Sequence, residues 1–256
     1  MSDEPTLRKA VLDDPEPDAP REAYAAWCDQ QADATTKARG EFIRVQLALA
    51  NTDRDLLRRG GAQALLTKNY ALLEQYESMW SQPIAGWIRK HTFRRGFVEH
   101  VALTAADFLS HGDALFAAAP IHHVDLLDVR EVDERLFASP LLRRLRSLGL
   151  DRCGLHDIHV QLLSASSHVG ELRWLSAGHN HLGMPAYGAL ATSTELPRLA
   201  FAEFGGNPVD PVEVLGVDGE EVVATEMPEA GQALERQHGH LEWLHRDEKP
   251  SNRFDY

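Results

Sequence analysis

The sequence predicts an α/β solenoid of about five stacked repeats, with a helical cap at the N-terminal end and a hairpin and helix at the C-terminal end. Three observations lead to this prediction. Apolar residues recur at helical spacing through residues 1–92, a leucine pattern then repeats every 23 to 27 residues, and an Asp218-Gly219 turn signal follows between two apolar runs. The predicted segments are 1–92 (helical cap), 93–211 (repeats), 212–245 (C-terminal cap) and 246–256 (polar tail).

Four helices are expected in the N-terminal cap, because apolar side chains recur there every three or four positions. The four apolar runs are centred near Val11, Trp27, Val45 and Tyr76. Pro20 suits a first helical turn, and the glycine pair at 60–61 separates the last two helices. We expect Gly40 to precede the third helix and the polar stretch 30–37 to form a loop.

The repeat is clearest over Leu145–Leu155, which has the pattern L-x-x-L-x-L-x-x-N/C-x-L with Cys153 in the ninth position. The five copies start at Val98, Ile121, Leu145, Leu172 and Leu199. This pattern is typical of leucine-rich repeats, whose inward apolar residues stack into one core and whose ninth residue hydrogen-bonds the turning backbone. Helical returns between the strands predict a curved arc like that of ribonuclease-inhibitor-type proteins.

The register of the repeats predicts which side chains share one face of the sheet, because neighbouring strands lie about 4.8 Å apart. The third-position row is His100, His123, Ser147, Trp174 and Phe201. From this face we predict a partner-binding surface made of Trp174, Phe201, Asp151, Arg152, His123, Asp125, Glu203 and His179. Trp174 and Phe201 would form an apolar platform for a partner, or would be covered by the chain's own C-terminal hairpin or tail.

Composition narrows the classes of partner. The 26 basic and 39 acidic residues give a formal net charge of -13, which disfavours binding to nucleic acid and to anionic membranes. The sequence shows no secretory signal and no membrane span, so a cytoplasmic location is expected. Cys28 and Cys153 are far apart in the sequence, so we expect both to be reduced thiols. No nucleophile elbow, phosphate loop or dinucleotide fingerprint occurs, which predicts a non-catalytic protein without a cofactor.

Several segments resemble one known bacterial module. They are Leu7–Pro15, Ala19–Trp27, Arg39–Leu47 and Phe93–His100. They are similar to the repeat-companion domain that occurs beside leucine-rich repeats in large bacterial families, notably in myxobacteria and planctomycetes. The stretch 30–37 departs from the module, where a shorter acidic turn with a glycine is expected. The resemblance implies architecture and brings no catalytic residues with it.

Three hypotheses for function follow. The leading one is a scaffold that binds a protein or an extended peptide on the predicted concave face. The second is an accessory or substrate protein of a biosynthetic or modification pathway, whose tail is docked or modified by an enzyme; that tail motif is Arg253, Phe254, Asp255 and Tyr256. The third is a metal-dependent enzyme that uses His100, His123 and Asp125.

Overall fold

The computed structural model describes residues 3–53, 56–57, 59–129, 133–218 and 221–246. Contacts divide the chain into two units. The first unit comprises residues 1–101 and 113–121, and the second comprises 102–112 and 122–256. Among the described residues, none of the helices has both the length and the apolar character that crossing a bilayer requires.

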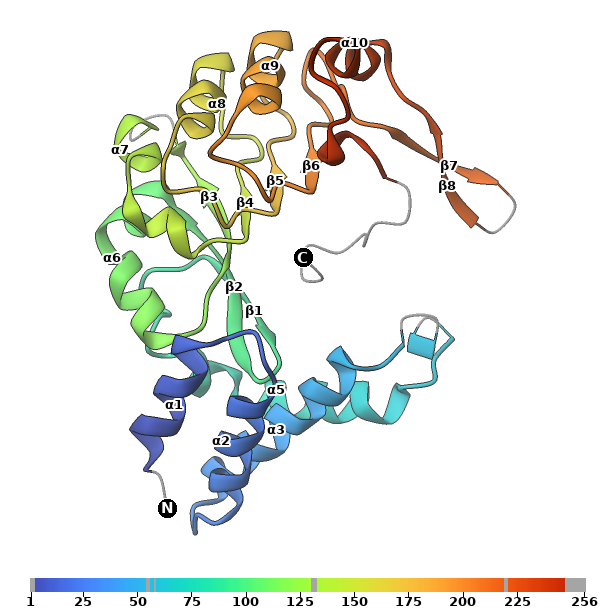
Figure 1. Cartoon of the computed structure of the whole chain (residues 1–256). Helices are drawn as coiled ribbons and strands as arrows, with labels where there is room; N and C mark the ends of the chain where they lie inside the picture. Colours follow the sequence, from blue (N-terminus) through green and yellow to red (C-terminus); the bar gives the residue numbers. More distant parts are fainter. Residues whose placement is uncertain (1–2, 54–55, 58, 130–132, 219–220, 247–256) are drawn as a thin grey trace. The chain divides into compact units, whose positions relative to one another are not determined.

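One six-stranded sheet has the order β1-β2-β3-β4-β5-β6, with one antiparallel pair and the other neighbours parallel. Its strands are β1 Lys90–Arg94, β2 Phe97–Thr104, β3 His123–Leu127, β4 Ser147–Gly149, β5 Trp174–Ser176 and β6 Phe201–Glu203. The segments that follow β2 to β5 include α6 Ala105–Ala118, α7 Asp133–Phe137, η2 Pro140–Arg144, α8 Asp157–Ser164 and α9 Met184–Thr192. In the second unit, α7, α8 and α9 lie on one side of β3 to β6 (Figure 1).

The predicted leucine-rich-repeat solenoid is wrong, because the structure is a mixed α/β fold built on this six-stranded sheet. The expected first repeat begins in β2, a strand that is eight residues long, whereas β4, β5 and β6 have three residues each. The connecting helices range from 5 to 14 residues. The apolar pattern recurs along the sequence, but the strands and helices that it forms differ in length from one copy to the next.

The pairing of the parallel strands follows the repeat spacing. His123 pairs with Ser147, and Ser147 pairs in turn with Trp174. Trp174 then pairs with Phe201. The predicted row is therefore confirmed from β3 to β6. The intervening side chains Val124, Leu148, Leu175 and Ala202 are fully buried.

The turns after these strands also share one conformation. Positive φ angles occur at Asp128 (53°), Arg152 (57°), His179 (54°) and Gly206 (78°). One residue further on, the Asn180 amide donates to the carbonyls of Leu150 and Ala177, both at 2.9 Å. The Cys153 thiol donates to the carbonyl of Leu126 at 3.2 Å. The expected role of the ninth position, which is to bind the turning backbone, is confirmed.

The first unit contains the four predicted helices. They are α1 Glu4–Asp13, α2 Ala19–Asp29, α3 Ala34–Ala50 and α5 Gln63–Ser81. The third helix begins earlier than expected, because the Asp33 carboxylate accepts from the Thr36 amide and caps it. Gly40 lies inside this helix, where a Cβ atom would come within 2.8 Å of the Ala25 carbonyl oxygen. Gly40 therefore permits close packing of α2 and α3.

A buried ion pair holds the first unit together. The Arg21 guanidinium lies 2.7 Å from the Glu99 carboxylate, and the two side chains are 0% and 1% exposed. Arg21 also donates to the carbonyls of Pro15 and Arg95. Arg95 in turn lies 3.0 Å from Glu99. The Glu99 carboxylate on β2 therefore links α2, through Arg21, to the β1–β2 turn, through Arg95.

The second unit ends in the predicted hairpin and helix. The strands β7 Val214–Asp218 and β8 Glu221–Glu226 pair antiparallel, and α10 Glu229–His238 follows. A short 3-10 helix, η3 Glu242–Leu244, returns toward β6. Trp243 packs edge-on against Phe204 with ring centroids 6.0 Å apart. Trp243 and Leu244 are buried, so these two side chains anchor the C-terminal segment, defined here as residues 240–246, in the core of this unit.

Candidate functional site

The aromatic pair, Trp174 on β5 and Phe201 on β6, is the centre of the predicted binding surface. The ring centroids lie 3.6 Å apart with an interplanar angle of 15°. Both residues are 7% exposed. They share a sheet face because they occupy paired positions on neighbouring parallel strands. The 27-residue spacing in the sequence therefore predicts this contact correctly.

The aromatic pair is covered by the chain itself. The Arg246 guanidinium lies 3.9 Å from the centroid of Phe201, and its Nη2 donates to the backbone carbonyl of Ala202. The Arg246 amide donates to Glu213 at 2.7 Å, which holds the segment in place. Arg246 is the first residue of the predicted tail, so one described side chain of that tail contacts Phe201, and residues 247–256 lie outside the described residues.

Acidic side chains lie beside the aromatic pair. The Asp151 carboxylate accepts from the Ser176 hydroxyl and from the Gly178 amide, both at 2.6 Å. Asp125 lies over Gly149, where an added Cβ atom would come within 2.1 Å of its carboxylate. Glu203 is exposed. Because Ser176 and Glu203 pair on the same strands as Trp174 and Phe201, this face combines ring faces with negative charge.

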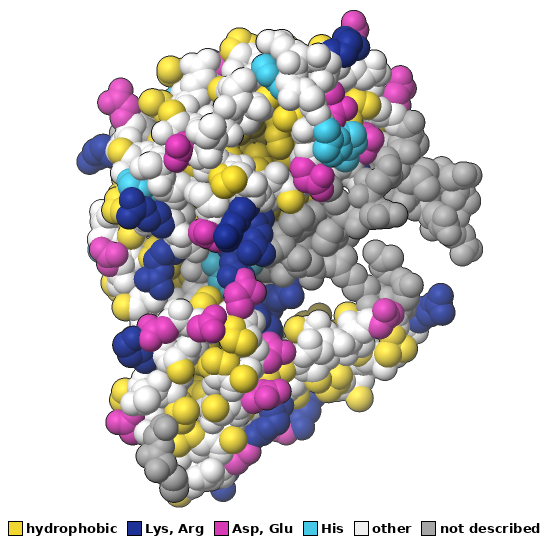
Figure 2. Space-filling model, in the orientation of Figure 1, with side chains coloured by type: hydrophobic (Ala, Val, Ile, Leu, Met, Phe, Trp, Pro, Cys, Tyr) yellow, Lys and Arg dark blue, Asp and Glu magenta, His cyan; other side chains and the backbone are white. Residues whose placement is uncertain are grey.

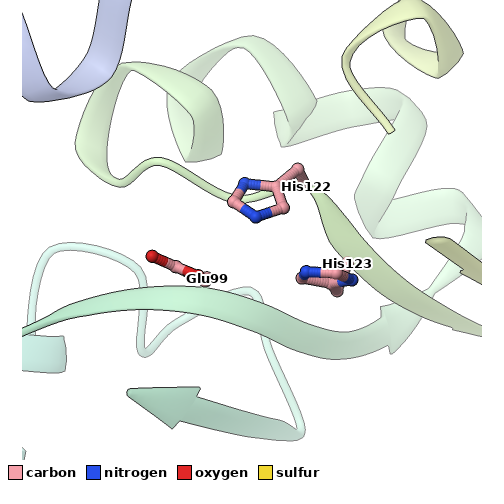
Figure 3. Close-up of side chains that lie close together, drawn as sticks. All are labelled: Glu99, His122 and His123. Carbon is pink, nitrogen blue, oxygen red and sulfur yellow. The ribbon is translucent and has the colours of Figure 1, made fainter. Parts of the chain in front are cut away.

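The other predicted residues lie elsewhere in the same unit. Arg152 and His179 are exposed in the turns that follow β4 and β5. His122 and His123 stand together where β3 begins, both buried, with ring centroids 4.5 Å apart (Figure 3). Glu99, also drawn in Figure 3, belongs to the first unit and pairs with Arg21 as described above.

Two predicted sets stay predictions. His100 belongs to the first unit, whereas His123 and Asp125 belong to the second, so neither unit alone contains the expected metal ligands. The tail motif Arg253 to Tyr256 lies outside the described residues. The hypothesis that an enzyme docks or modifies the tail is therefore untested.

A second cluster of candidate ligand side chains lies at the C-terminal end of the second unit, and the sequence did not predict it. Glu235 on α10 meets His240 and His245, and one ligand atom from each lies within 4.8 Å of the other two. Histidine and acidic side chains gather on the exposed surface over α10 and η3 (Figure 2). We call Glu235, His240 and His245 the histidine cluster. The sequence contains one signal of a chain reversal here, because a glycine commonly ends a helix and Gly239 lies between Glu235 and His240. In the structure, Gly239 follows α10 with a φ of 83°.

The carboxylate of Glu235 is the centre of this cluster. Its Oε1 lies 2.8 Å from His245 Nε2, 3.3 Å from His240 Nδ1 and 3.1 Å from the Leu241 amide. Burial raises the pKa of Glu235, but hydrogen bonds from His245 and Leu241 outweigh it, so the pKa lies below its ordinary value. The carboxylate is therefore ionised and faces both imidazoles.

The first unit contains a cavity of about 230 Å³. Its walls include Glu4, Arg8, Tyr24, Arg39 and Trp80. Arg39 lies between the rings of Trp80 and Phe97, each 4.9 Å from its guanidinium carbon, and burial lowers its pKa to about 10. It remains a cation at neutral pH. The surrounding rings stabilise that charge, and Arg39 Nη1 is buried without a hydrogen-bond partner among the described residues.

Comparison of the chain with family models, with curated proteins and with solved structures found no match. The resemblance to the repeat-companion domain therefore stays a prediction.

Proposed function

We propose that the protein is a non-catalytic binding protein whose aromatic pair receives an arginine side chain from a partner protein or extended peptide. The observation that carries this proposal is the contact between Arg246 and Phe201 at 3.9 Å. The site offers a guanidinium two things at once, a ring face and the acceptor carbonyl of Ala202. A guanidinium stacks on aromatic faces and donates in its own plane, so it suits both features.

The charge around the aromatic pair supports the same partner. Glu203 is exposed on β6, and Asp151 and Asp125 lie along the same face. The whole chain carries a formal net charge of -13. A basic peptide would therefore be attracted to this face before it makes contact, and an acidic one would be repelled.

In this proposal Arg246 acts as an internal ligand. A partner can reach Phe201 only after Arg246 leaves, so the affinity for the partner falls by the fraction of molecules in which the site is open. Removal of the Arg246 side chain should therefore strengthen binding. This competition distinguishes a binding site from a purely structural contact, which would gain nothing when Arg246 is removed.

The experiment is a selection of displayed random peptides on three immobilised full-length proteins. They are the wild type, Arg246→Ala, and Arg246→Ala combined with Trp174→Leu and Phe201→Leu. We expect peptides with arginine at one fixed position to be enriched on Arg246→Ala and to bind it at least about tenfold more tightly than the wild type. The triple variant should retain none of this binding, because it lacks the ring faces.

Arg236→Ala is the matched control, since Arg236 is an exposed arginine on α10. It should behave as the wild type does. Thermal melting of every variant verifies that the fold persists. Absence of arginine from the selected peptides, or equal binding to the triple variant, would contradict the proposal.

A further inference from the structure

We propose that the histidine cluster is a zinc site that fixes the C-terminal segment to α10. Two imidazole nitrogens approach one carboxylate oxygen, with His245 Nε2 and His240 Nδ1 at 2.8 and 3.3 Å from Glu235 Oε1, and the two rings stack with centroids 4.6 Å apart. Ligand atoms about 2.0–2.2 Å from a tetrahedral Zn²⁺ lie roughly 3.3–3.6 Å from one another, so the His240 separation matches this geometry, whereas His245 and Glu235 would move apart from hydrogen-bond distance by several tenths of an ångström. Glu235 and His245 are half-buried and His240 is exposed, so solvent can supply the fourth ligand.

Each histidine also has a carboxylate on its outer side. His245 Nδ1 lies 3.4 Å from Glu213, and His240 Nε2 lies 3.4 Å from Glu242. Histidines that bind metals commonly donate the other ring N–H to a carboxylate, which fixes the tautomer and raises the basicity of the ligand. Both imidazoles here have that arrangement, with one nitrogen toward Glu235 and the other toward an outer acid.

Each imidazole of the histidine cluster lies between two carboxylates. A neutral imidazole has one N–H, so it can donate to only one of its two carboxylates. His245 faces Glu235 and Glu213, and His240 faces Glu235 and Glu242. If each outer nitrogen carries the proton, both inner nitrogens are lone pairs that a cation can bind, whereas a protonated imidazole donates to both of its carboxylates. A bound divalent cation therefore takes the place of the inner protons between the imidazoles and Glu235.

The donor set indicates which metal the cluster would hold. Mg²⁺ and Ca²⁺ prefer shells made of oxygen ligands, whereas two imidazoles and one carboxylate suit Zn²⁺. The surrounding charge also favours a cation, because Glu213, Glu235 and Glu242 all lie at this site. Three protein ligands leave the fourth position of a tetrahedral zinc ion to solvent.

Zinc at this point would connect the two ends of a short chain reversal. Glu235 lies in α10, whereas His245 directly precedes Arg246, the residue that covers Phe201. Between them Trp243 is buried against Phe204. Metal binding would thus hold Arg246 over the aromatic pair. This consequence rests on the proposed binding function, whereas the zinc site itself does not.

The test is calorimetric titration of the untagged, chelator-treated full chain with ZnCl₂. We expect one Zn²⁺ per chain and a loss of affinity of at least about 100-fold in Glu235→Gln and His245→Ala. His240→Ala should lose a similar amount, and its side chain is 66% exposed, so the fold should survive the change. Glu213→Gln should weaken binding by about 10- to 100-fold, as expected for an outer carboxylate.

His238→Ala is the matched control, because the chain has 13 histidines and adventitious binding must be separated from the site. This residue lies on the last turn of α10 outside the cluster. It should leave the affinity unchanged. Cobalt(II) in place of zinc should give the visible absorption of a four-coordinate ion, which His240→Ala should abolish. Substoichiometric zinc, or equal losses in His238→Ala and His240→Ala, would overturn the site.

A separate measurement tests the effect on the aromatic pair. Zinc should weaken the binding of a selected arginine peptide to the wild type and leave its binding to Arg246→Ala unchanged. If zinc binds but both proteins respond alike, the coupling to Arg246 is wrong while the metal site stands. Failure of the binding function appears independently, as a peptide selection without arginine.

Discussion

The two units hold their chain segments together with different chemistry. The first unit buries charge, since Arg21 and Glu99 form an ion pair that is almost fully inaccessible. The second unit uses neutral groups for the same purpose. Its Asn180 amide and Cys153 thiol donate to backbone carbonyls of neighbouring turns. Its charged clusters lie at the surface and around the C-terminal segment.

The difference indicates which unit is the more fragile to single substitutions. Removing one member of a buried ion pair leaves an uncompensated charge in a medium that solvates it poorly. Removing a neutral amide leaves carbonyls without a donor, which is costly but less so. We therefore expect substitution of the buried charged groups in the first unit to lower the free energy of unfolding more than substitution of the neutral groups in the second unit.

The largest effect is expected for Arg21→Met. This variant leaves the buried Glu99 with Arg95 at 3.0 Å and Arg94 at 3.9 Å, and it removes donors from the carbonyls of Pro15 and Arg95. The free energy of unfolding should fall by about 3 kcal/mol, the lower end of the cost of removing one member of a buried ion pair, measured by chemical denaturation. Lys9→Met is the control, because Lys9 pairs with Asp13 at the surface and its loss should be undetectable. A loss below 1 kcal/mol in Arg21→Met would show that the pair is not stabilising.

A smaller loss is expected for Asn180→Ala. The side chain accepts from the Leu155 amide at 3.0 Å and donates to the carbonyls of Leu150, Ala177 and Gly178. Its removal should cost about 2 kcal/mol, because buried backbone groups lose their partners. Asn207→Ala provides the comparison, since Asn207 makes similar bonds but is only half-buried and should cost less. An equal cost in both variants would contradict the role assigned to burial.

The two cysteines allow the units to be followed separately. Cys28 lies in the first unit and Cys153 in the second, and both are buried. Burial raises the pKa of Cys28 to about 11, so native protein should react slowly with thiol reagents at neutral pH. In single-cysteine proteins, Arg21→Met should accelerate labelling of Cys28 at least tenfold and leave Cys153 unchanged. Equal acceleration at both sites would mean that the units open together.

Much of the local structure could be predicted because it depends on neighbouring residues. The apolar runs around Val11, Trp27, Val45 and Tyr76 give the four helices. The 27-residue spacing gives the pairing of β4, β5 and β6. The architecture could not be predicted, because a repeat implies similar helices between the strands. The connecting helices in fact differ in length from one copy to the next. The start of α3 was missed because the polar residues after Asp33 hid a helix cap.

The candidate sites divide in the same way. The stacking of Trp174 on Phe201 follows from the register, so the sequence predicts it. The cover by Arg246 depends on Glu213, 33 residues away along the chain, and no periodicity encodes that contact. The histidine cluster depends on a reversal at Gly239 that returns His240 and His245 to Glu235. Such contacts arise from the packing of Trp243 and Leu244, which only the folded chain displays.

The turns after β3 to β6 have a consequence for how the chain can vary. Three of the four residues with positive φ are not glycine, and each pays a conformational cost for that backbone shape. The fourth, Gly206, lies beneath the His179 ring, where an added Cβ atom would come within 2.4 Å of Nδ1. Positions 179 and 206 therefore form one coupled pair, in which a larger residue at one turn requires a smaller residue at the other.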